Sequence, residues 1–228
     1  MSQFGVDKIK NIAVVGHAGS GKTSLAEAVL FKSGAIDRLG KVADGNTTSD
    51  FDAEEIRRKA SLSLSVLPFV SGENKINLLD APGLFDFAGG FYEALSAADS
   101  TLIVISGKSG VTVGAKKAYR EAVKAQKARM IFVGKMDSEH ADFYKVLEDL
   151  KASFGPSICP VVVPYIEDRE VKCYINLLEM QAYQYDSKGV RTIVEMPDTK
   201  HRLDGLIAAI SEAVAETNEE LFDKYFSG

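Results

Sequence analysis

The chain has 228 residues, of which 46% are hydrophobic and 26% are charged, and its formal net charge is −5. This much apolar material can form a core, so the composition excludes a largely disordered chain. No apolar run is long enough to cross a bilayer, and the opening MSQFGVDKIKN lacks an apolar signal core, so we expect a cytoplasmic protein with no membrane partner. The acidic balance argues against direct sequence-specific nucleic-acid binding. Two cysteines, Cys159 and Cys173, are too few for a disulfide framework.

Residues 9–154 alternate strand-like and helix-like segments. The run IKNIAVV at 9–15 is short and β-branched, which is typical of a strand buried on both faces; a glycine-rich loop and a helix ending near Gly34 follow. The polar stretch 35–59 predicts a long loop with a short helix at 53–58. Beyond it we expect strands at 61–70 and 75–80, a helix at 92–98, a strand at 101–106, a helix at 115–127, a strand at 129–134 and a helix at 144–154. This alternation predicts an α/β fold whose mainly parallel sheet has helices on both faces.

The character of the chain changes near Gly155-Pro156. Four short strand-like runs follow, PVVVPY, EVKCYI, QAYQY and TIVEM, separated by turn residues, and an acidic helical tail occupies 201–226. We therefore predict a core domain at 1–155 and a small α+β subdomain at 156–228.

The strongest motif follows the first predicted strand and matches G-x-x-x-x-G-K-[ST]. It consists of Gly16, His17, Ala18, Gly19, Ser20, Gly21, Lys22 and Thr23. In such a loop, backbone N–H groups converge on phosphate oxygens, and glycines permit close approach. The ammonium of Lys22 would bind the β- and γ-phosphates, and the hydroxyl of Thr23 would bind Mg²⁺. The motif predicts a P-loop nucleotide site.

A second motif, Asp80-Ala81-Pro82-Gly83, lies at the end of a predicted strand. An Asp there can hold Mg²⁺ through water, and the N–H of Gly83 can bind the γ-phosphate. By itself this pattern also forms ordinary turns, so its value depends on the phosphate loop before it.

A third motif, Gly134-Lys135-Met136-Asp137, also follows a predicted strand. The carboxylate of Asp137 would accept from the two N–H donors of guanine, whereas adenine lacks that donor pair. The methylene stem of Lys135 would cover the base. The three motifs together predict GTP rather than ATP as the ligand.

With these motifs in register, the chain resembles the GTPase domain of translational GTPases of the elongation factor G type, and among them the elongation factor G-like paralogues. The resemblance rests on VVGHAGSGKTSLAEAVLFKSGA, DGNTTSDFDAEE, LLDAPGLFDFAGG, VGKMD and LEDLKASFGP, and it extends through PYIEDREVKCYINLLEMQAYQY. It implies a P-loop GTPase core with two switch regions at 1–155, and an insertion subdomain at 156–228. It also implies a ribosome-associated enzyme that hydrolyses GTP to GDP with Mg²⁺.

The resemblance also implies roles for particular residues. Lys22 and Gly83 would be catalytic, and Thr23, Ser61 and Asp80 would hold the metal. The nucleotide-binding set would be Gly16, His17, Ala18, Gly19, Ser20, Gly21, Lys22, Thr23, Ser24, Asp80, Gly83, Lys135, Met136 and Asp137.

Several positions depart from the family pattern. Ser61 stands at the switch threonine, although it can also be read simply as the first residue of a strand. Gly19 and Gly134 replace an Asp and an Asn that are common in the family. Leu84 follows Gly83 where the main elongation factors have the histidine that orients the attacking water. An isobutyl group cannot orient water, so we expect the chain alone to be nearly inactive.

Two further interpretations stay open at this stage. One is a GTP-dependent ribosome-binding switch, or a ribosome-protection or release-factor module, with little hydrolysis of its own. The other, an ATP-using P-loop enzyme, is disfavoured by Lys135 and Asp137. The family's last base-binding motif, a Ser-Ala loop, does not occur after the subdomain, so the resemblance implies that the end of the GTPase domain is missing.

Overall fold

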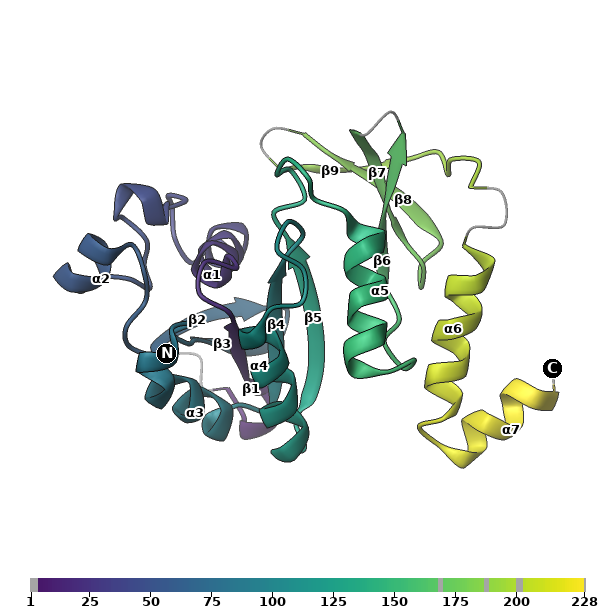
Figure 1. The fold of residues 1–228 in the computed structure, drawn as a ribbon, viewed down its shortest axis with the longest axis horizontal. Coiled ribbons are helices and arrows are strands. Elements are labelled where there is room, and N and C mark those ends of the chain that lie inside the picture. The colour runs from purple at the N-terminus through teal and green to yellow at the C-terminus, as the bar shows by residue number, and fades with distance from the viewer. Residues whose placement is uncertain (1–3, 168–169, 187–188, 200–202, 228) are drawn as a thin grey trace. The chain divides into compact units, whose positions relative to one another are not determined.

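The structure is a computed structural model, and it describes residues 4–167, 170–186, 189–199 and 203–227. The chain forms two compact units, Met1–Asp142 and Phe143–Gly228 (Figure 1).

The first unit is built on a five-stranded sheet. Its strands are β1 (Ile9–Gly16), β2 (Ser65–Ser71), β3 (Asn74–Asp80), β4 (Ser100–Ser106) and β5 (Ala128–Gly134). They lie in the order β2-β3-β1-β4-β5; β3, β1, β4 and β5 are parallel, and β2 pairs antiparallel with β3. The predicted mainly parallel sheet is therefore confirmed.

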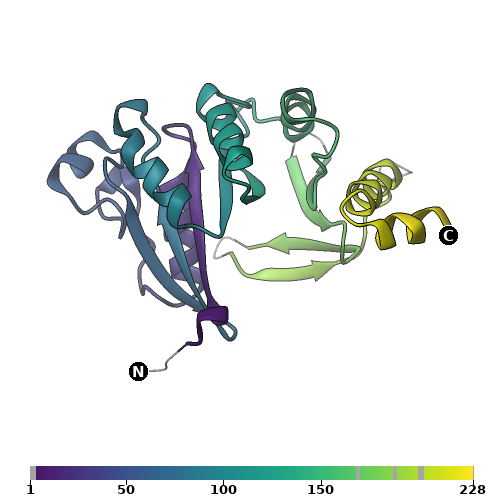
Figure 2. The same ribbon diagram turned by 90° about the horizontal axis from the view of Figure 1, so that it is seen from below.

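Helices cover both faces of this sheet, as predicted. They are α1 (Lys22–Lys32), α3 (Ala88–Ala97) and α4 (Val113–Lys124). Helix α2 (Ala53–Arg58) lies in the long loop before β2, and short 3₁₀ turns occur at Val6–Lys8, Val42–Asp44 and Phe85–Phe87. Figure 2 shows α3 and α4 on one face and α1 on the other. On the α1 face, Val14 and Val104 of the sheet pack with Ala26 and Leu30 in a buried cluster. This packing fixes α1, and with it the loop that precedes it.

One predicted strand begins later than its sequence pattern indicates. The alternation from Ser61 onward predicts a strand at 61–70, whereas β2 begins at Ser65. The N–H groups of Leu62 and Ser63 donate instead to the carboxylate of Glu55, at 2.8 and 3.0 Å. Because these donors are already bonded to a side chain, the stretch before Ser65 does not join the sheet.

The second unit combines helices with an antiparallel sheet. It contains α5 (Phe143–Phe154), β6 (Val162–Glu167), β7 (Glu170–Asn176), β8 (Gln181–Tyr185), β9 (Arg191–Val194), α6 (Asp204–Ala215) and α7 (Glu219–Ser227). The strands pair in sequence order, around a core that includes Val163 and Ile175. The sequence places the division after α5, but the structure groups α5 with the second sheet. Tyr144 of α5 donates its hydroxyl to the carbonyl of Pro164, 3.2 Å away.

Candidate functional site

The loop between β1 and α1 is shaped by glycines at two positions. Gly16 has φ +147°, and a Cβ there would lie 2.4 Å from the carbonyl oxygen of Val104. Gly21 has φ +102° and caps α1 without any side-chain hydrogen bond to the first turn. The first N–H groups of α1 therefore keep their donor capacity for a ligand, and a helix N-terminus favours an anion there.

Lys22 is the buried cation of this loop. Only 6% of its surface is exposed, and its Nζ donates to the carbonyl oxygen of His17 at 3.0 Å. Burial lowers the pKa of Lys22, while the carboxylates of Asp80 and Asp50 oppose that shift. A buried ammonium beside uncapped N–H groups is an arrangement that attracts phosphate.

The hydroxyl of Thr23 connects two segments that are distant in the sequence. Its Oγ1 donates to Oδ2 of Asp80 at 2.8 Å and lies 3.0 Å from Oγ of Ser61. Ser49 also donates to Oδ2 of Asp80, at 2.7 Å. The three residues named as metal ligands from the sequence, Thr23, Ser61 and Asp80, are thus brought together by α1, β3 and the loop before β2.

Asp50, which is not among the site residues expected from the sequence, joins this group. Its exposed fraction is 4%, and neither of its carboxylate oxygens has a hydrogen-bond partner, nor does Oδ1 of Asp80. Burial raises the pKa of both carboxyls, and a nearby hydroxyl opposes the shift at each: Ser61 at Asp50 and Ser49 at Asp80. Buried carboxylate oxygens without donors, beside two hydroxyls, fit a hard divalent cation such as Mg²⁺.

Gly83 lies against the phosphate loop. A Cβ at this position would be 2.4 Å from Nζ of Lys22 and 2.7 Å from the backbone nitrogen of Ala18. No other residue type fits without displacing the loop or the lysine. Leu84, the next residue, lines the cavity with an apolar side chain.

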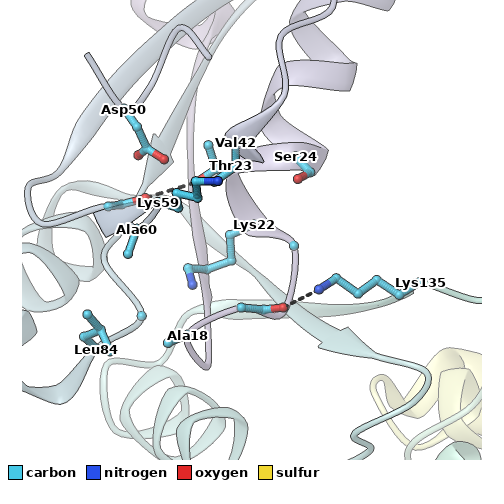
Figure 3. Close-up of a pocket in the computed structure, with 14 residues that line it drawn as sticks. Ala18, Lys22, Thr23, Ser24, Val42, Asp50, Lys59, Ala60, Leu84 and Lys135 are labelled. Carbon is cyan, nitrogen blue, oxygen red and sulfur yellow. Dashed lines mark hydrogen bonds between the residues drawn. The ribbon is translucent and has the colours of Figure 1, made fainter. Parts of the chain in front are cut away.

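These residues surround a cavity of about 160 Å³ (Figure 3). Figure 3 shows Lys22 extending into it, with Leu84 on one side and Lys135 on the other. Nine residues of the predicted site line it: Ala18, Gly19, Gly21, Lys22, Thr23, Ser24, Ser61, Gly83 and Lys135. Gly16, Ser20 and Asp80 do not line it, and the last two are buried. His17 packs against α4, where a Cβ on Gly114 would be 2.7 Å from its Nδ1.

The third motif reaches the cavity through one residue only. Lys135 has φ +56°, and its Nζ donates to the carbonyl oxygen of Gly19 at 2.6 Å. Met136 packs instead against Gly107, where a Cβ would be 2.5 Å from its sulfur. Asp137 is exposed and does not line the cavity. The structure thus joins the third motif to the glycine-rich loop through the lysine.

Two buried glutamates, neither among the residues expected from the sequence, hold the long loop. Glu27 of α1 accepts the N–H of Gly40 at 3.1 Å and that of Thr48 at 2.9 Å. Glu55 of α2 accepts from the two residues after Ser61. The partners of Glu27 lie far along the chain, so no local sequence pattern marks it. Glu55 also accepts the N–H of Asp52 in a capping box, and this D-x-x-E spacing is a local signal that could have found it.

The comparisons with known proteins agree with this geometry. A family model described as the elongation factor Tu GTP binding domain matches residues 7–222. The chain belongs to this family of GTP-binding domains. A crystal structure of a protein from Thermus thermophilus superposes with a TM-score of 0.91 at 38% identity, over 97% of this chain. As an elongation factor Tu-type domain of the translational GTPases, the chain binds guanine nucleotide and has the fold of a GTPase.

The chain spans only 33% of the Thermus protein, so the activity of a whole factor is a separate question. Among the described residues of this GTP-binding domain, no helix is long and apolar enough to cross a membrane.

Proposed function

We propose that the chain is the GTP-binding domain of an elongation factor G-like translation factor. It would bind and hydrolyse GTP with Mg²⁺ in the cytoplasm and couple this reaction to a ribosomal step such as translocation. The observation that carries the proposal is the junction of Thr23, Ser61 and Asp80 beside the buried Lys22. It joins a phosphate loop, a long switch-like loop and a strand-end carboxylate at one cavity. The ribosome would be contacted by the longer factor, and this domain would bind no nucleic-acid sequence itself.

In the reaction we assign charge stabilisation to Lys22 and to the N–H of Gly83. We assign the γ-phosphate of GTP to a position beside both groups, and their closeness supports this, since a Cβ on Gly83 would lie 2.4 Å from Nζ of Lys22. Thr23, Ser61 and Asp80 would hold Mg²⁺, with Asp50 close by. When bound, Mg²⁺ would neutralise negative charge on the phosphate oxygens. The rest of the site positions the substrate and adds little covalent chemistry.

For the base we assign Lys135, Met136 and Asp137. The ammonium of Lys135 bonds to Gly19, and its stem passes 3.7 Å from the position of a Cβ on Gly21. A base held there would rest on this stem, with the carboxylate of Asp137 at its guanine edge. The remaining members of the site, from Gly16 to Ser24, would surround the phosphates.

Turnover with and without ribosomes tests this proposal. The longer factor that contains this domain is expected to hydrolyse GTP slowly alone and much faster with ribosomes, and Lys22→Ala should nearly abolish the stimulated rate. Lys32→Ala, at the far end of α1, is the matched control and should leave the rate unchanged. GTP turnover by the wild type that ribosomes do not accelerate would contradict the proposed translation role.

A second candidate, a GTP-dependent binding switch with little hydrolysis, is favoured by Leu84. Its side chain borders the cavity beside Gly83 and cannot hold a water in line with the phosphate. If hydrolysis does occur, another group must position the water, and Leu84→Ala should change stimulated turnover by less than about tenfold. If ribosome binding requires GTP but no phosphate is released from the GTP, the binding-switch function is supported instead.

A further inference from the structure

Lys117 of α4 has no role in the phosphate or base contacts proposed above. Its ammonium is surrounded by three aromatic rings, at 5.3 Å from the ring centre of Phe85, 5.4 Å from that of Phe91 and 5.2 Å from that of Tyr92. All three distances are within the range of a cation–π attraction, about 6 Å. We call Lys117 and these three rings the aromatic cage.

The ring faces take the place of an anionic partner for this ammonium. Glu121 lies four residues after Lys117 on the same helix, the usual spacing for an ion pair. Its carboxylate pairs instead with Arg120 at 3.2 Å and with Lys124 at 3.1 Å. Within the described part of the chain no ion pair to Lys117 occurs, so the half-buried ammonium is held by the rings.

The cage connects α4 to the segment that carries Gly83. Phe85 comes two residues after Gly83, and its ring also faces His17 of the phosphate loop, with 6.1 Å between ring centres. On α4, Gly114 lies so close to His17 that a Cβ would be 2.7 Å from Nδ1. Helix α4 therefore contacts both the phosphate loop and the segment after Gly83.

The buried ring of the cage anchors this arrangement. Phe91 of α3 is 7% exposed and packs edge-on against Tyr92, with 5.1 Å between ring centres. Phe85 and Tyr92 are about half exposed, so apolar burial alone holds them weakly. The charge of Lys117 adds an attraction that draws Phe85 and the start of α3 toward α4, one that an apolar side chain of equal length lacks.

We propose that Lys117 is a positioning residue that holds residues 83–85 against the phosphate loop. It acts through Phe85 and does not touch the nucleotide site itself. For the nucleotide, the inference rests on the proposed function: keeping Gly83 beside Lys22 favours a ligand with a γ-phosphate over one without it. A side chain that stabilises one arrangement of a mobile segment raises affinity only for the ligand that prefers that arrangement.

Hydrogen–deuterium exchange of the nucleotide-free chain tests the positioning role directly. In Lys117→Met, which keeps the length of the side chain but removes its charge, a peptide covering residues 81–92 should exchange about tenfold faster. Lys117→Arg should exchange like the wild type, because a guanidinium also stacks on aromatic rings. Lys116→Met, at the exposed neighbouring position, is the matched control and should have no effect. Peptides from β1 report whether each variant is folded.

The inference is overturned if Lys117→Met exchanges like the wild type, or if the Met and Arg variants accelerate exchange equally. If Lys117→Met does not fold, Phe85→Leu replaces it in the experiment, because this variant keeps the charge and removes one ring. Exchange of residues 81–92 at the wild-type rate in Phe85→Leu would also overturn the inference.

Affinities for GDP and a non-hydrolysable GTP analogue give the second readout. Lys117→Met should lower the ratio of analogue affinity to GDP affinity about three- to tenfold, and Lys117→Arg should restore it. An unchanged ratio, with faster exchange, would overturn the link to the γ-phosphate. If the wild type binds neither nucleotide, the proposed function fails, whereas the exchange experiment still decides whether Lys117 positions the segment.

Discussion

The hydroxyl oxygens of Thr23 and Ser61 lie 3.0 Å apart although 38 residues separate them in the sequence. One stands in the first turn of α1, the other at the end of the long loop that precedes β2. Thr23 also donates to the carboxylate of Asp80, so Ser61 is linked to that carboxylate through the hydroxyl of Thr23. We expect the geometry of the proposed metal site to depend on the residue that holds Ser61 in place.

Glu55 is the residue that holds it. Its buried carboxylate accepts the N–H groups of Asp52, Leu62 and Ser63, so Glu55→Ala removes the side-chain partner of three donors and should lower the free energy of unfolding by about 1–3 kcal/mol. The neighbouring Glu54 bonds only to exposed arginines, and Glu54→Ala is the matched control, with little change expected. Urea denaturation measures both. Equal midpoints for the two variants would show that Glu55 is not an anchor.

The close packing around Gly83 gives a second prediction, because a larger side chain has no room there. A methyl group at this position would lie 2.4 Å from Nζ of Lys22, so Gly83→Ala should displace the lysine or the segment and weaken binding of a GTP analogue at least tenfold. In Gly89→Ala the added methyl group meets nothing within 4 Å and lies in α3, where alanine favours the helix by about 1 kcal/mol. Isothermal titration and thermal unfolding separate the two effects. Full binding by Gly83→Ala would mean that the close packing is not required.

The sequence was sufficient for the parts of the site that follow local rules. The phosphate loop, Asp80 at a strand end and Lys135 after β5 could be located because each follows a recognisable strand in chain order. Asp50 and Glu27 could not, since Asp50 lies in a long loop without periodicity and Glu27 binds that loop from a distant helix. Glu55 stands at capping-box spacing from Asp52, but that pattern does not indicate its bonds to Leu62 and Ser63. The alternation from Ser61 to Ser65 resembles a strand, but the contact of Glu55 overrides it.

Asp50 gives a prediction about pH. Burial raises the pKa of this carboxyl above its ordinary value of 3.8, so the native state holds the proton to higher pH than the unfolded state does. The contribution of Asp50 to stability therefore falls as pH rises from about 3.8 through the raised pKa. In the chain without metal or nucleotide, the free energy of unfolding of Asp50→Asn should equal that of the wild type near pH 3.5 and exceed it at pH 7.

Urea midpoints at the two pH values measure this difference, with Asp37→Asn, at an exposed position, as the control. If Asp50→Asn is no more stable than the wild type at pH 7, the buried charge of Asp50 does not lower the free energy of unfolding and the prediction is wrong. The same substitution should weaken nucleotide binding in the presence of Mg²⁺, because it removes a carboxylate beside the proposed metal ligands.

The central claim is that the cavity at Lys22 and Lys135 binds guanine nucleotides and that Asp137 recognises the base. Competition of GTP and ATP with a bound fluorescent GDP analogue, in the presence of Mg²⁺, tests this claim most directly. GTP should displace the analogue from the wild-type chain at a concentration at least tenfold below that needed for ATP. Asp137→Asn should reduce GTP affinity about 10- to 100-fold, equivalent to about 1–3 kcal/mol for the lost carboxylate contacts, and so remove the preference. Displacement by ATP and GTP at equal concentrations in the wild type would contradict the account.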